Sequence, residues 1–122
     1  MARRRIPIDV GMAAVHSVQA GAERVNRNRD FANAVRFLLE DLAIRIPGNS
    51  VEVRVPPLGA VQCVAGPQHR RGTPPNVVEL SPQTWFALAT GEIDIDAALA
   101  TGAVIASGVR ATEFAAVLPL TR

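Results

Sequence analysis

A change of hydrophobic spacing near the middle of the chain constrains the fold most. Residues 30–46 carry apolar side chains along one stripe at helical spacing, which predicts an amphipathic helix. After residue 47, three valines alternate with charged residues over 51–55, which is the spacing of a half-buried strand. Because the helices are segregated from a run of strands, the pattern favours a sheet covered by helices, the α+β class.

Helix-start signals and turn residues place the other elements. Asp9 and Asp30 are the expected N-caps of the first two helices, and Gly11 is expected to weaken the first. Opposite charges four residues apart predict ion pairs of Arg36 with Glu40 and of Asp41 with Arg45 on the exposed side of the second helix. Further strands are expected over 60–65, 76–80 and 103–107, with helices after Ser81-Pro82, after Asp94 or Asp96, and over 112–118. The predicted order is ααβββααβα, with short connections that favour an antiparallel sheet.

The chain has 122 residues, enough for one hydrophobic core. Residues 1–8 are expected to form a basic extended arm and residues 9–122 a single domain. The apolar runs are too short and too often interrupted for an export signal or a membrane helix, so we expect a cytoplasmic protein that does not insert into membranes. Its cations are arginines, and acidic residues are interspersed with them, so no specific nucleic-acid partner is expected.

Residues that commonly carry chemistry are few. Cys63 lies inside a predicted strand, where a free cysteine usually packs as a small apolar residue. His16 and His69 are far apart in sequence and lack metal-ligand spacing. Phosphate-binding glycine motifs are absent from the sequence. We therefore expect no catalytic residue, no metal and no cofactor, and the protein is not expected to be an enzyme.

The last 40 residues combine large apolar side chains with many small ones. This composition is compatible with an ordinary core or with a cavity that has aromatic walls, small residues leaving space, and a terminal helix able to act as a lid. The candidate lining residues for a hydrophobic ligand are Phe37, Leu42, Trp85, Phe86, Leu88, Val104, Phe114 and Leu118.

Several segments resemble the sterol carrier protein family, in particular its short single-domain actinobacterial branch. The resemblance rests on Thr73-Pro-Pro-Asn-Val-Val-Glu-Leu, Ser81-Pro-x-x-Trp-Phe-Ala-Leu-Ala-Thr-Gly, Ile95–Thr101-Gly, Val104-x-Ala-Ser-Gly and Phe114–Leu120. It implies a five-stranded, mostly antiparallel sheet covered by helices around an apolar tunnel for lipids or fatty-acyl chains. The fifth strand would lie within 66–75 or beside Ser107–Arg110. The chain ends in Leu-Thr-Arg, unlike peroxisomal relatives.

Three hypotheses about function follow. The first is non-catalytic binding or transfer of a hydrophobic small molecule in such a tunnel. The second is a protein-interaction or accessory domain on the same fold, with the tunnel collapsed because its small residues pack closely; a homodimer or another protein partner stays open. The third is enzymatic and rests on His69-Arg70-Arg71, whose cations suit an anionic head group.

Overall fold

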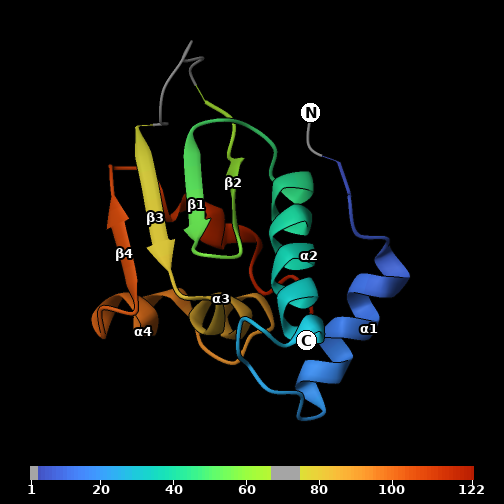
Figure 1. The fold of residues 1–122 in the computed structure, drawn as a ribbon. Coiled ribbons are helices and arrows are strands. Elements are labelled where there is room, and N and C mark those ends of the chain that lie inside the picture. Colours follow the sequence, from blue (N-terminus) through green and yellow to red (C-terminus); the bar gives the residue numbers. More distant parts are fainter. Residues whose placement is uncertain (1–2, 67–74) are drawn as a thin grey trace.

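Two packed helices begin the computed structural model, which describes residues 3–66 and 75–122 (Figure 1). Helix α1 (Ile8–Gln19) begins after Pro7, and Asp9 lies in its first turn without capping it. Helix α2 (Arg29–Arg45) is capped by Asn28, whose side chain accepts a hydrogen bond from the Phe31 amide. The expected caps at Asp9 and Asp30 were therefore wrong. Asp30 instead accepts a hydrogen bond from the Ser17 hydroxyl.

The two helices cross where α1 has no side chain. A Cβ atom built on Gly11 would lie 2.1 Å from Cδ1 of Phe37 on α2. Gly11 lowers intrinsic helix propensity, as the sequence predicted, but its absent side chain is what lets the Phe37 ring lie against the α1 backbone. The helix pair therefore depends on this glycine for close packing.

The arm before α1 folds back on α2. Arg4 forms an ion pair with Asp41 at 2.7 Å. Arg45 also binds Asp41, at 2.8 Å, so the predicted pair of Asp41 with Arg45 is confirmed. Asp41 is buried, however, where the sequence predicted exposure. Arg36 and Glu40 do not form the predicted pair. Arg36 donates to the carbonyl of Leu58, and Glu40 accepts the amides of residues 5 and 6, because both side chains find tertiary partners.

The sheet has four strands within the described residues and is mixed. The strands are β1 (Val51–Val55), β2 (Gly59–Cys63), β3 (Asn76–Leu80) and β4 (Val104–Ser107). Their order is β2-β1-β3-β4, with β1/β2 and β3/β4 antiparallel and β1/β3 parallel. Two of the three strand pairs are antiparallel, as expected, but the parallel pair was not expected and the described residues form four strands, not five. Residues 108–110 form a bend and turn instead of a strand, and residues 67–74, the other expected place for one, lie outside the described residues.

The chain leaves β2 through an unusual backbone conformation. Val64 has a φ of +68°, its amide donates to the carbonyl of Ile46, and its carbonyl accepts from the amide of Ser50. Arg110 then holds the carbonyl of Ala65 at 2.7 Å. These contacts hold the chain where it leaves β2, and β3, the next described strand, pairs with β1 and not with β2.

The C-terminal part follows its local signals closely. Ser81 caps α3 (Pro82–Ala89), and Asp94 caps α4 (Ile95–Ala100), as expected. The last helix is η1 (Ala111–Val117), a 3₁₀ helix over nearly the predicted residues. A single hydrophobic cluster connects these elements to α1, α2 and the inner face of the sheet, while the other face carries Glu52, Arg54 and Glu79 together with the exposed Ile105.

Candidate functional site

The predicted lining residues converge on one hydrophobic cluster. Seven of the eight are at most 4% exposed, and Leu118 is partly buried against them. Leu42, Trp85, Phe86 and Phe114 have no exposed area at all. A side chain with no area accessible to water borders no space large enough for a water molecule. These four side chains therefore fill the core in this structure.

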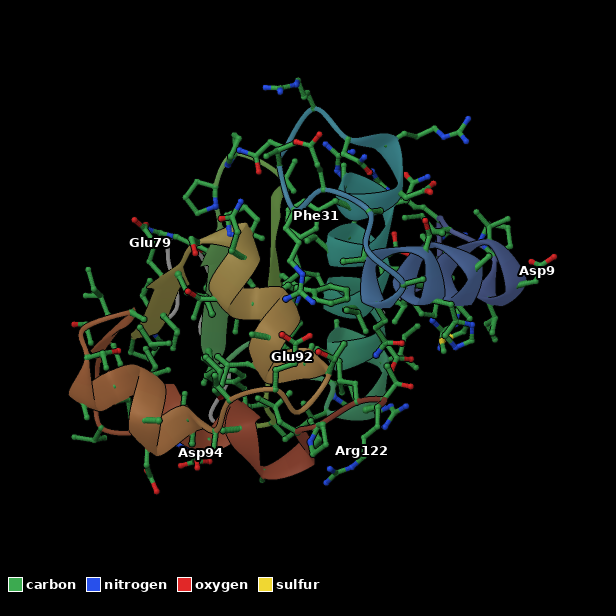
Figure 2. All side chains as sticks on the ribbon, turned by 90° about the horizontal axis from the view of Figure 1, so that it is seen from below. Asp9, Phe31, Glu79, Glu92, Asp94 and Arg122 are labelled. Carbon is green, nitrogen blue, oxygen red and sulfur yellow. The ribbon has the colours of Figure 1, made fainter. Side chains whose placement is uncertain are left out.

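Aromatic contacts organise this cluster. The Trp85 indole nitrogen donates to the carbonyl of Val35 at 3.2 Å, which ties α3 to α2. The rings of Phe31 and Phe86 lie 6.1 Å apart and tilted by 51°, a favourable aromatic arrangement. Phe31, seen between α2 and α3 in Figure 2, was not among the predicted lining residues although it heads the helical stripe. That position in the stripe was the signal for its burial.

A groove opens beside this cluster. It has a volume of about 500 Å³ and lies between α3, the start of α4 and the C-terminal segment 115–122. Leu88 and Leu118 line it and are the two predicted residues that face this space. The other lining residues are Gly91, Glu92, Ile93, Asp94, Ile95, Ala97, Ala115, Pro119 and Arg122. We call this hollow the C-terminal groove; Figure 2 shows Glu92, Asp94 and Arg122 around it.

The C-terminal segment closes one side of this groove with few attachments. Phe114 inserts into the core from η1 and is fully buried. Beyond it, the amides of Leu120 and Thr121 both donate to the carbonyl of Ala89, at 2.8 and 3.3 Å. Because the segment is a short 3₁₀ helix and an extended tail, its outward movement requires breaking few backbone hydrogen bonds.

A charged pair stands at the edge of this groove. Both carboxylate oxygens of Glu92 accept hydrogen bonds from Arg24, at 2.7 and 2.8 Å. This contact with Arg24 holds the pKa of Glu92 below its ordinary value and raises the pKa of Arg24. The guanidinium of Arg24 also lies 4.8 Å from the centre of the Phe86 ring. The pair connects the loop after α1 with the loop after α3.

The other candidate chemical groups do not gather at the groove. Cys63 is buried, and burial raises its thiol pKa to about 12, which keeps it protonated and unreactive. Among residues 3–66 and 75–122, no three His, Cys, Asp or Glu side chains are placed to hold a metal ion. His69, Arg70 and Arg71, on which the enzymatic hypothesis rested, lie outside the described residues.

No helix in the described part of the chain is both long and apolar enough to cross a membrane.

Comparisons with known proteins place the chain in a family. Among curated proteins, none matches the sequence. A family model described as bacterial SCP ortholog matches residues 26–120, which include every element from α2 to η1. On this match, the chain belongs to the family of bacterial orthologues of sterol carrier proteins.

Proposed function

We propose that this protein binds a hydrophobic small molecule of the lipid or fatty-acyl type without chemically changing it. The observation that carries the proposal is the C-terminal groove, which lies directly over a core of aromatic and branched side chains. Its volume falls within the few hundred to about 1,000 Å³ typical of small-molecule sites. Family membership supports the same conclusion, since the fold is that of a lipid-binding family.

The driving force for such binding is removal of apolar surface from water. Each methylene group of an acyl chain that becomes buried contributes about 0.8 kcal/mol. Leu88, Ile93, Ile95 and Leu118 offer an apolar entrance, while Glu92 and Arg122 provide polar groups at the rim that can orient a head group. Neither role requires a nucleophile, a metal or a cofactor.

Deeper binding requires the core to open. We infer that an acyl chain enters beneath the C-terminal segment and displaces Phe114, so that Trp85, Phe86 and Val104 come to line the ligand. The same opening would reach Phe37 and Leu42 on α2 only for a long ligand, since Phe37 packs against Gly11 of α1. The small number of backbone hydrogen bonds that hold the tail, both to the carbonyl of Ala89, supports this route of entry.

A second candidate function is an accessory or protein-interaction domain in which the core never opens. The observation that favours it is the complete burial of Leu42, Trp85, Phe86 and Phe114, which leaves no tunnel beside them in this structure. The two candidates differ in one respect that can be measured, namely whether the purified protein takes up an apolar molecule.

Native mass spectrometry of freshly purified protein, followed by solvent extraction and lipid analysis, tests this difference. We expect a stoichiometric lipid or acyl compound, or saturable binding of an added fluorescent fatty acid. A bare protein mass together with no binding of the fatty acid would reject the carrier function and favour the accessory domain.

A charged substitution in the groove locates the site. Leu118→Asp places a carboxylate on the groove wall, and we expect it to weaken fatty-acid binding at least about tenfold, because a charge must be desolvated there. Ala116→Asp is the matched control, since Ala116 is exposed on the same segment and does not line the groove. Equal affinities for the two variants, with both folded by circular dichroism, would place the ligand elsewhere.

A further inference from the structure

A second groove, which shares no lining residue with the first, lies beside α2 and the free edge of the sheet. Its volume is about 620 Å³, and its walls are the arm, α2, residues 47–49 and strand β2. Leu39, Ala43 and Leu58 give it an apolar floor, and all three are largely buried. We call it the edge groove. Figure 1 shows β2 at one end of the sheet, next to α2.

Backbone groups in the middle of β2 face this groove. The carbonyl of Ser50 accepts from the side chain of Asn76 on β3, so the amide of Val51 points the opposite way, toward β2. Val51 is paired with Cys63, and this pair is therefore hydrogen-bonded. Because bonded and non-bonded pairs alternate, the backbone groups of Ala60 and Gln62 point outward, away from β1.

Leu58 and Val64 flank the two outward-pointing residues of β2, and their backbone groups already bind α2 or the residue after it. The carbonyl of Leu58 accepts from Arg36, and the amide of Val64 donates to the carbonyl of Ile46. Ala60 and Gln62 lie between them and line the groove, and their outward backbone groups have no partner within the described chain. An unpaired strand edge of this kind accepts another strand.

The charges around the edge groove select the partner. Arg3, Arg5 and Arg36 all line it, and all three are exposed. Arg3 and Arg5 have no side-chain partner in the described chain, and Arg36 uses only Nε, for Leu58. The one carboxylate in the lining, Glu40, is occupied by the amides of Arg5 and Ile6. The groove therefore presents an excess of positive charge along an unpaired strand.

We propose that the edge groove binds an acidic peptide segment of a partner protein, which adds to β2 as an extended strand. The peptide backbone would pair with Ala60 and Gln62, its apolar side chains would contact Leu39 and Ala43, and its carboxylates would meet the three arginines. This peptide site is separate from the C-terminal groove, so it does not depend on the ligand proposed above.

A designed peptide tests the proposal. The probe is an eight-residue peptide of alternating valine and glutamate, capped at both ends, with fluorescein for anisotropy measurements. On binding of the unlabelled peptide, we expect the amides of Ala60 and Gln62 to become protected from hydrogen exchange, as measured by NMR. If these two amides are already protected in the free protein, the edge is occupied by the chain itself and the proposal is wrong.

Two pairs of variants separate strand addition from general charge attraction. Ala60→Pro removes an outward N–H, a position where an edge strand tolerates proline, and should abolish binding, whereas Ala60→Thr keeps the N–H and the affinity. Arg3→Glu combined with Arg5→Glu should weaken binding about tenfold or more. Arg27→Glu with Arg29→Glu makes the same charge change at exposed positions outside the groove and should change affinity less than about twofold.

Three results would overturn the proposal. One is equal weakening by the two double variants, which would indicate non-specific attraction. Another is unchanged binding by the Ala60→Pro variant when its NMR spectrum shows the native fold. The third is displacement of the peptide by millimolar inorganic phosphate, with the amides of Ala60 and Gln62 unprotected, which would make the arginines an anion site and not a strand-addition site.

Discussion

The two ends of the chain contact the same core in different ways. At the N-terminal end, α1 lies so close to α2 that Gly11 has no room for a side chain, and Arg4 places its guanidinium 5.3 Å from the Phe37 ring. At the C-terminal end, the buried side chains of Phe114 and Leu120 and two hydrogen bonds to the carbonyl of Ala89 attach the segment. The difference indicates a rigid N-terminal scaffold and a C-terminal segment that can separate from it.

The largest expected effect is on the scaffold. Gly11→Ala should destabilise the protein by about 3 kcal/mol, because the added methyl group would overlap the Phe37 ring and overpacking costs typically 1–3 kcal/mol or more. Helix propensity alone predicts the opposite, a gain of about 0.5–1 kcal/mol. Urea unfolding decides between the two.

Gly59→Ala is the control for this substitution. A Cβ atom at Gly59 would lie 3.5 Å from Leu39 Cδ1, an ordinary contact, so we expect a change below about 1 kcal/mol. If both variants unfold at the same urea concentration, the α1–α2 crossing is not the rigid part of the molecule.

The second prediction concerns the C-terminal segment. Native-state hydrogen exchange should show that the amides of Leu120 and Thr121 open with a free energy about 2 kcal/mol or more below that of core amides in α2, because their opening needs only local separation. Amides that hold α2 to the sheet, such as that of Val64, should exchange only through global unfolding. Equal opening free energies at Leu120 and Val64 would mean that the segment does not separate on its own, and the proposed route of ligand entry would fail.

Local signals in the sequence predicted most of the elements but not how they meet. The caps at Ser81 and Asp94 were correct because a cap depends only on the residues that follow it. The sequence predicted Asp30 as the cap of α2, but Asn28 caps it, and Asp30 instead accepts a hydrogen bond from Ser17 of α1. The residues around Asp30 in the sequence could not reveal this contact with another helix.

The order of the strands was beyond local signals for the same reason. Alternating valines predicted β1, and β3 was predicted over its observed residues, but nothing local indicated that the two strands pair in parallel. After β2 the chain turns at Val64, which has a positive φ and hydrogen bonds to Ile46 and Ser50. Valine rarely adopts this conformation, so its sequence position carried no warning. The edge groove exists only because of this strand order and was not predicted.

The candidate binding residues illustrate a different limit. The sequence predicted Trp85 and Phe114 as lining residues, and both side chains lie in one buried hydrophobic cluster. Whether converging side chains enclose a space or fill it depends on how their shapes fit together in three dimensions. Their role as ligand-lining residues therefore stays a prediction, to be tested by ligand uptake.

The smallest predicted effect concerns the contact that joins the two ends. Arg24 follows α1 and Glu92 follows α3. Both side chains are more than a third exposed, at 34% and 40%, and this exposure limits the stabilisation that their ion pair gives. Glu92→Gln should destabilise the protein by about 0.5 kcal/mol at pH 7 in urea unfolding.

The pH dependence of this effect tests its electrostatic origin. Arg24 lowers the pKa of Glu92 in the folded protein, so the stabilisation is present above the ordinary pKa of 4.5 and is lost as the pH falls through the lowered pKa. At a pH below this lowered pKa the stability difference between wild type and Glu92→Gln should therefore shrink toward zero, because a protonated Glu92 resembles glutamine. A difference that stays the same at both pH values would show that the two ends are joined by packing of Arg24 on Phe86 and not by charge.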